Sequence, residues 1–179
     1  MTITRVILIV LSLCLWTFIF SNALSDGETS SQQSQTVTES VQEVVGAIDP
    51  DSPIATATGE SFDLLHACIR NLAHFLQYFA LGACVFGSYL SFVKKGNRRY
   101  GYIPPCLLFL TVAVDEYLQS LTDGRASEFT DVVTDCTGFA CGICLALLAF
   151  GLIKWTVIAV KRRRLYEGRE NGSTLAKAR

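Results

Sequence analysis

The chain has 179 residues, half of them hydrophobic, with only 17% charged and a formal net charge of −1. A soluble domain usually carries about a quarter charged residues, so this composition argues against a soluble protein. Basic and acidic residues are segregated along the chain, and no basic patch indicates a nucleic-acid partner. Long apolar runs alternate with short charged connections, a pattern typical of a multi-pass protein of the cell membrane.

The apolar runs predict an all-α membrane protein with four transmembrane helices. Each run has about 20 residues, which at a rise of about 1.5 Å per residue crosses a hydrocarbon core of about 30 Å. Helices are expected because every backbone polar group inside a bilayer must be satisfied internally. The predicted spans cover residues 6–23, 71–93, 103–121 and 137–159.

The basic residues predict the orientation of these spans. They cluster between the second and third spans and directly after the fourth, whereas the other connections hold only Arg70 and Arg125. Because Lys and Arg are enriched in cytoplasmic loops, both termini are predicted to be cytoplasmic. The two clusters are Lys94, Lys95, Arg98 and Arg99, and then Lys161, Arg162, Arg163 and Arg164.

The first 24 residues have two interpretations. A single Arg5, an apolar stretch and then Ser21-Asn22-Ala23 match a secretory signal peptide with a small-residue cleavage site. The apolar stretch is slightly long for a signal peptide, which favours a retained transmembrane anchor over residues 1–24.

Three further segments are predicted. Residues 25–60 form a flexible extracytoplasmic loop that is rich in Ser, Thr, Gln and Glu at its start. Apolar residues at helical spacing over 41–48 indicate either a short helix on the membrane surface or a part of that loop. Residues 61–160 form a helical membrane domain whose first helix begins near Ser61, and residues 161–179 form a basic cytoplasmic tail that is disordered after Leu165.

The seven cysteines do not indicate a metal or catalytic site. Most lie within the spans, where free cysteine behaves as a small hydrophobic residue. Cys68 and Cys136 lie near the outer face, where an oxidising environment permits a disulfide. No cofactor and no metal ion is predicted.

Polar side chains within and beside the spans form the predicted site. A charged residue in hydrocarbon costs about 2.5–3.5 kcal/mol on insertion scales, so such residues mark a function by default. Residues four apart line one stripe of a helix, and the antiparallel third span carries its acids at the same depth. The predicted binding residues are Arg70, His74, Tyr78, Asp115, Glu116, Gln119, Arg125, Asp131 and Asp135.

Each of these residues also has a purely structural interpretation. Arg70 paired with Asp115 or Glu116 neutralises charge and fixes the helix register. Asp131 and Asp135 lie at a helix N-terminus, where the helix dipole favours a carboxylate. The shared depth of the whole set favours a site over separate structural roles.

A small-residue face is predicted on the fourth span. Gly138 and Gly142 form a GxxxG step, and Ala146 continues it. Small residues at this spacing let a neighbouring helix approach closely, so close packing is the expected role.

The spacing of the polar residues resembles the VanZ family, small membrane proteins named after a teicoplanin-resistance protein. The resemblance covers residues 70–142 and the first span. It rests on Arg70, His74-Phe75, Tyr78, Leu81, Asp115-Glu116, Gln119, Gly124-Arg125, Asp131-Val132, Gly138 and Gly142. It implies a helical membrane protein and does not supply a reaction.

Binding is the favoured function of this predicted site. Arg70 and Arg125 suit anionic groups, and the carboxylates suit amino or hydroxyl groups. The expected partners are membrane lipids, through their headgroups, and a cell-wall precursor or a lipoglycopeptide antibiotic. The sequence does not indicate an oligomeric state.

An intramembrane enzyme acting on a lipid-linked substrate is the alternative. His74 would act as general acid or base with Asp115 or Glu116, and a metal-dependent version would add His66. No HExxH, serine-nucleophile or phosphate-loop motif supports catalysis. Transport is disfavoured because the polar residues stay in the outer half of the spans.

Overall fold

The computed structural model describes residues 3–93, 100–122 and 129–177, with side chains up to residue 164. The regular elements in these ranges are all α-helices, which confirms the predicted all-α class. The helices are α1 (Ile3–Ala23), α2 (Gly27–Ile48), α3 (Glu60–Phe92), α4 (Ile103–Ser120) and α5 (Phe129–Lys177).

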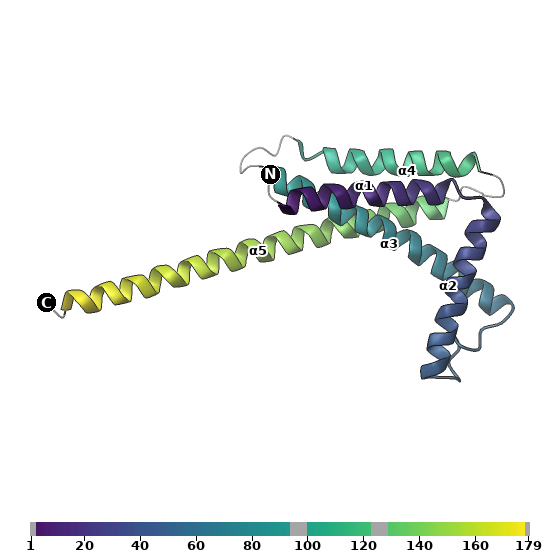
Figure 1. Ribbon diagram of the computed structural model, residues 1–179, viewed down its shortest axis with the longest axis horizontal. Helices are drawn as coiled ribbons and strands as arrows, with labels where there is room; N and C mark the ends of the chain where they lie inside the picture. Colours follow the sequence, from purple (N-terminus) through teal and green to yellow (C-terminus); the bar gives the residue numbers. More distant parts are fainter. Residues whose placement is uncertain (1–2, 94–99, 123–128, 178–179) are drawn as a thin grey trace.

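Helices α1, α3, α4 and α5 form a bundle, and α2 lies across one end of it. Figure 1 shows α1 and α4 running in one direction and α3 and α5 running in the other, while α2 crosses them where α1 ends. We call this end of the bundle the α2 end. The core at the centre of the bundle consists of Ile19, Tyr78, Leu81, Val85, Val112 and Phe139.

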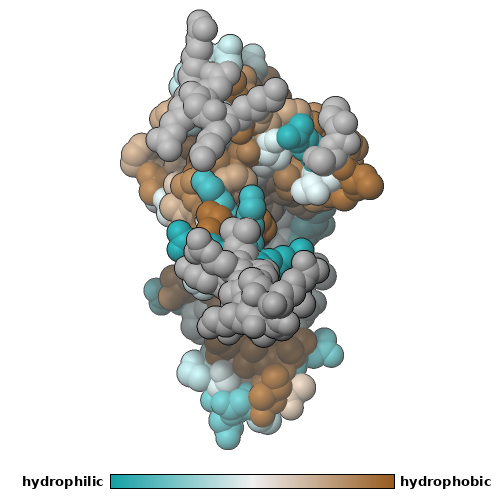
Figure 2. Space-filling view, turned by 90° about the vertical axis from the view of Figure 1, so that its left-hand side faces the viewer, coloured by the Kyte–Doolittle hydropathy of each residue, from teal (hydrophilic) through white to brown (hydrophobic). Residues whose placement is uncertain are grey.

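Three helices within the described ranges are long and apolar enough to cross a membrane. They are Ile3–Ala23, Glu60–Phe92 and Phe129–Arg164. Apolar side chains cover much of the bundle surface, and hydrophilic ones gather at the lower tip, where α2 and its connection to α3 lie (Figure 2). This distribution is the one expected for helices that face lipid.

The predicted third span, residues 103–121, corresponds to α4, which is not among these three helices. It has 18 residues and begins with Pro104 and Pro105, which suit the first turn of a helix because that turn does not need their missing N–H groups. Its second half carries Asp115, Glu116 and Gln119, which lower its apolar character. The third span, the total of four spans and the orientation of the termini therefore stay predictions.

The segment predicted as a flexible loop is mostly helical, and that prediction is wrong for residues 27–48. Asp26 caps α2, because its carboxylate accepts a hydrogen bond from the Thr29 backbone N–H at 2.7 Å. This bond also lowers the pKa of Asp26 below its ordinary value. The predicted surface helix over 41–48 is thus the last part of a longer helix.

The structure confirms where the predicted 61–160 domain begins but differs from the prediction beyond its end. A helix beginning near Ser61 is confirmed, because α3 starts at Glu60 after Gly59, whose φ of 56° lies in the left-handed region that glycine tolerates. The predicted disordered tail is wrong over residues 165–177, since α5 continues to Lys177.

Cys68 and Cys136, the predicted candidates for a disulfide, are free thiols.

Helices α3 and α5 approach each other so closely that three of their glycines leave no room for a Cβ. A methyl group added at any of these glycines would collide with a backbone atom of the facing helix. The facing pairs are Gly82 with Phe139, Gly138 with Phe75, and Gly142 with Phe79. The prediction that Gly138 and Gly142 form a close packing face is therefore confirmed, and α3 supplies a third glycine to it.

Replacing Gly142 with Ala is expected to destabilise the bundle. The new methyl group would meet the carbonyl oxygen of Phe79 and the amide nitrogen of Ala83, and overpacking of this kind costs about 1–3 kcal/mol. The measurement is denaturant unfolding in detergent micelles, followed by circular dichroism.

The matched control is Gly151→Ala on the same helix, where no atom lies within 4 Å of an added Cβ. This variant should be neutral or stabilised by up to about 1 kcal/mol, because alanine is the better helix former. Equal stability of the two variants would show that α3 and α5 do not pack as closely as described.

Candidate functional site

A polar cavity of about 300 Å³ lies at the α2 end of the bundle. Four helices enclose it: α1, α2, α3 and α4. We call it the polar cavity. Its walls are formed by Phe18, Ile19, Asn22 and Ala23, by Ser30, Gln33, Ser34 and Val37, by Arg70, Ala73, His74 and Gln77, and by Asp115 and Gln119.

Asp115 is the buried carboxylate of this cavity. The residue is 2% exposed, and its Oδ2 accepts hydrogen bonds from the Tyr78 hydroxyl at 3.0 Å and from Nε2 of Gln119 at 3.2 Å. Tyr78 is fully buried on α3, so the first of these bonds joins α3 to α4. A buried carboxylate held by two donors is a fixed negative group at the cavity wall.

Arg70 lies at the opening of the cavity and is tied to α5. Its Nη2 lies 3.2 Å from Oδ2 of Asp131, and its side chain is 45% exposed, against 5% for that of Asp131. The structural interpretation of Arg70 from the sequence paired it with Asp115 or Glu116. The structure pairs it with Asp131 instead, because α5 packs closely along α3 and brings Asp131 beside the guanidinium group.

His74 connects the cavity to a second buried acid. Its Nδ1 lies 3.5 Å from Oδ1 of Asp135, a residue of α5 that is fully buried. Within the described part of the chain, neither oxygen of Asp135 accepts a hydrogen bond, and the imidazole of His74 is the basic group that lies beside it. The predicted pairing of His74 with Asp115 or Glu116 is replaced by a pairing with Asp135.

Helix α2 closes the cavity and was not predicted to do so. Ser34 Oγ lies 2.6 Å from Nε2 of His66, which ties α2 to α3 beside the cavity. Gln42 donates two hydrogen bonds of 3.0 Å to the carbonyl oxygens of Ile54 and Ala57, which ties α2 to the α2–α3 connection. Ser30, Ser34 and Val37 lie at helical spacing, and this was the signal that the sequence offered.

The structure therefore brings most of the predicted residues to one place, although it divides them into two groups. The first group lines the cavity and consists of Arg70, His74, Asp115 and Gln119. The second group lies outside the cavity wall and contacts members of the first: Tyr78 contacts Asp115, Asp131 contacts Arg70, and Asp135 contacts His74. Glu116 is half-buried beside Asp115 and is not part of the cavity wall. Arg125 lies outside the described residues.

Within the described ranges, no three His, Cys, Asp or Glu side chains are placed to share a metal ion. The cavity instead presents a guanidinium group, an imidazole, amides, hydroxyl groups and a carboxylate. These groups donate and accept hydrogen bonds and carry both signs of charge. Such a lining can recognise a polar head with anionic and hydroxyl or amino groups.

The two interhelical contacts are expected to differ in strength. Tyr78 and Asp115 are both buried, and polar contacts between transmembrane helices contribute about 0.6 kcal/mol on average and up to about 1.7. Arg70 is half-exposed, and an exposed ion pair contributes about 0–1 kcal/mol. We expect the Tyr78→Phe/Asp115→Asn double-mutant cycle to give the larger coupling energy, about 1 kcal/mol, and the Arg70→Gln/Asp131→Asn cycle to give less than about 0.5 kcal/mol.

Unfolding of the single and double variants in detergent micelles measures both coupling energies under the same conditions. A coupling near zero for Tyr78 and Asp115 would mean that the hydrogen bond does not join α3 to α4. A larger coupling for the Arg70 pair would mean that this pair is better shielded from solvent than its exposure indicates.

Comparison with known proteins gives one finding. The chain matches the family model described as VanZ/LLP1 over residues 8–151, which includes every predicted binding residue. No curated protein and no solved structure matches the chain significantly.

Proposed function

The chain belongs to the VanZ/LLP1 family, and on that premise we propose that it binds the polar head of a membrane-embedded amphiphile in the polar cavity. The observation that carries the proposal is the convergence of Arg70, His74, Asp115 and Gln119 on one cavity. The ligand class is a lipid headgroup, a cell-wall precursor or a glycopeptide antibiotic. A role in glycopeptide resistance or in the cell envelope follows from the last two.

The charges of the cavity support a ligand with more than one kind of polar group. Arg70 at the opening suits a phosphate or carboxylate, because a guanidinium group forms paired hydrogen bonds with such groups. Asp115 deeper in the wall suits an amino or hydroxyl group, since an ionised carboxylate only accepts hydrogen bonds. An anionic headgroup with hydroxyl or amino substituents satisfies both sides.

The proposal includes the predicted topology, with four spans, cytoplasmic termini and an outward-facing cavity. Its support is the direction of the helices: α1 and α4 run opposite to α3 and α5, as alternate spans must. The basic residues Lys161 to Arg164 lie on the part of α5 that extends away from the α2 end of the bundle (Figure 1), and under the positive-inside rule this supports an outward-facing cavity.

Arg70→Gln is the variant that tests binding, because Arg70 is half-exposed and its loss should leave the fold intact. The protein in nanodiscs is titrated with teicoplanin, a polyprenyl diphosphate-linked wall precursor and phosphatidylglycerol-containing lipid. At least one ligand should bind the wild-type protein, and Arg70→Gln should weaken it by about tenfold, the effect of losing a charged hydrogen bond.

The matched control is Lys154→Gln, which removes an exposed cation from α5 outside the cavity. It should bind as the wild type does. If none of the three ligands binds the wild-type protein, or if Arg70→Gln binds as tightly as Lys154→Gln, the proposal is wrong.

Catalysis on a lipid-linked substrate is the second candidate, and the His74–Asp135 pair favours it. The carboxylate lies 3.5 Å from Nδ1, and a hydrogen bond formed between them on substrate binding would orient the imidazole and leave its other nitrogen available as a general base. Asp135 takes the orienting role that the sequence assigned to Asp115 or Glu116.

Turnover decides between the two candidates. As a binding protein, the purified chain should release no product from a lipid-linked phosphate or ester. Product formation that is lost in His74→Gln and retained in Lys154→Gln would establish the enzyme instead.

A further inference from the structure

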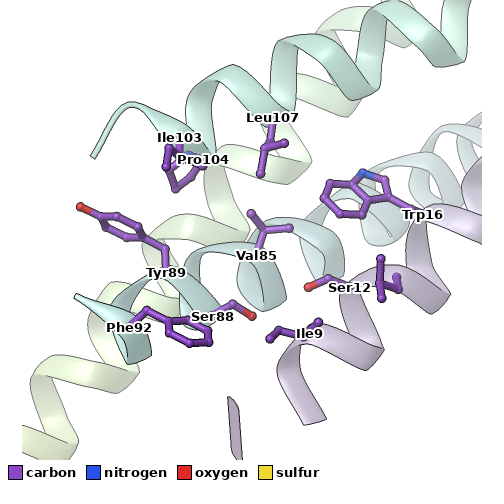
Figure 3. A pocket seen from close by; sticks show the side chains of 11 residues that line it. Ile9, Ser12, Trp16, Val85, Ser88, Tyr89, Phe92, Ile103, Pro104 and Leu107 are labelled. Atoms are coloured by element: carbon purple, nitrogen blue, oxygen red, sulfur yellow. The ribbon is translucent and has the colours of Figure 1, made fainter. Parts of the chain in front are cut away.

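A second cavity, of about 310 Å³, lies at the end of the bundle opposite to α2, between α1, α3 and α4. Figure 3 shows its wall, which is almost entirely apolar and includes Ile9, Trp16, Val85, Phe92 and Leu107. Its volume lies at the lower end of the range of ligand pockets, roughly 300–1,000 Å³. We call it the apolar cavity.

The apolar cavity is separate from the polar one. The fully buried side chains of Tyr78 and Leu81 lie between them on α3, and Val112 lies between them on α4. The indole N–H of Trp16 donates a hydrogen bond of 2.8 Å to Thr111 Oγ1, which fixes the ring at the inner limit of the apolar cavity. A ligand here therefore does not reach Arg70 or His74.

The Ser88 hydroxyl group in this wall is left for a ligand. The Ser88 hydroxyl is buried and has no hydrogen-bond partner within the described residues. Ser12, opposite, is satisfied, because its hydroxyl donates to the Leu8 carbonyl oxygen at 2.8 Å. Figure 3 shows the two hydroxyl groups pointing toward each other across the cavity. A buried hydroxyl group without a partner is costly, so Ser88 favours a ligand with an ester or carboxyl oxygen.

A cation lies beside the same cavity. The guanidinium carbon of Arg5 is 5.1 Å from the centroid of the Phe92 ring, and Phe92 is part of the cavity wall. This distance is typical of a cation–π contact, which leaves the N–H groups at the edge of the guanidinium plane available for an anion. The positive charge of Arg5 beside the apolar cavity is therefore complementary to an acidic headgroup.

We infer that the apolar cavity binds one acyl chain of an anionic phospholipid. The chain fills the space between α1, α3 and α4, the ester oxygen accepts a hydrogen bond from Ser88, and the phosphate lies against Arg5. The membrane supplies this ligand, and an anionic headgroup gains affinity from a nearby basic residue on the order of fivefold per residue. The site is independent of the ligand of the polar cavity.

The chain has two tryptophans, and their positions provide the test. Trp16 lies in the cavity wall, whereas Trp155 is 68% exposed on α5 and reports the surrounding lipid. Trp155→Phe and Trp16→Phe each leave one reporter. Both proteins are placed in phosphatidylcholine nanodiscs that contain a minor fraction of dibrominated phosphatidylglycerol or dibrominated phosphatidylcholine, and quenching of tryptophan fluorescence is measured.

The expected result is that Trp16 shows a stronger preference for the brominated phosphatidylglycerol than Trp155 does. Adding Arg5→Gln should reduce this preference, on the order of fivefold in apparent affinity, whereas Lys154→Gln should leave it unchanged. Adding Ser88→Leu, which fills the cavity, should lower the quenching of Trp16 by both lipids.

The inference is overturned if Trp16 and Trp155 show the same lipid preference, or if Arg5→Gln leaves the preference of Trp16 unchanged. The comparison between the two reporters needs no change at Arg5, so it decides the matter even if that variant does not insert. Arg70 is unaltered throughout, so failure here leaves the proposed function of the polar cavity standing.

Discussion

The close approach of α3 and α5 is the constraint on which the rest of the structure depends. Glycines on both helices bring backbone against backbone, and the two helices run in the same direction with a fixed register. This register places Asp131 beside Arg70 and Asp135 beside His74, one turn apart on each helix. A helix pair held apart by larger side chains would leave both acids without their bases, and a buried carboxylate without a partner is strongly unfavourable. Close packing and charge pairing are therefore two consequences of the same small residues.

Because of this packing, the polar side chains of α3 contact acidic residues on two different helices, α5 and α4. Toward α5, Arg70 and His74 meet acids that fix them in place, and toward α4, the Tyr78 hydroxyl group fixes Asp115. The same Arg70, His74 and Asp115 also line the cavity under α2. The supporting groups thus restrict the orientation of the groups that can meet a ligand, which is the arrangement expected of a pre-organised site.

Much of the helical bundle could be predicted from the sequence, because apolar runs of membrane length and a GxxxG step are local signals. The pairing of acids with bases could not. Asp115 and Asp131 are equally plausible partners for Arg70 by depth, and the choice between them depends on which helix packs closer to α3.

Helix α2 was missed for a different reason, because its Ser, Thr and Gln residues resemble a disordered segment. The helix is stabilised by the Asp26 cap and by contacts such as that of Ser34 with His66, which joins residues distant in sequence. Composition carries no information about such contacts.

The two cavities lie at opposite ends of the bundle and differ in the polarity of their walls. Both lie along the seam between α1, α3 and α4, yet one is lined by charged and amide groups and the other by aliphatic and aromatic side chains. Buried Tyr78 and Leu81, together with the Trp16–Thr111 hydrogen bond, close the seam between them. The two cavities are therefore separate within the described residues. The apolar cavity also has a structural consequence, since a chain that occupied it would supply the packing that α1, α3 and α4 do not supply to each other at that end. Occupancy of this cavity would then stabilise the very helices that carry the polar residues, through packing alone and without contact between the two ligands.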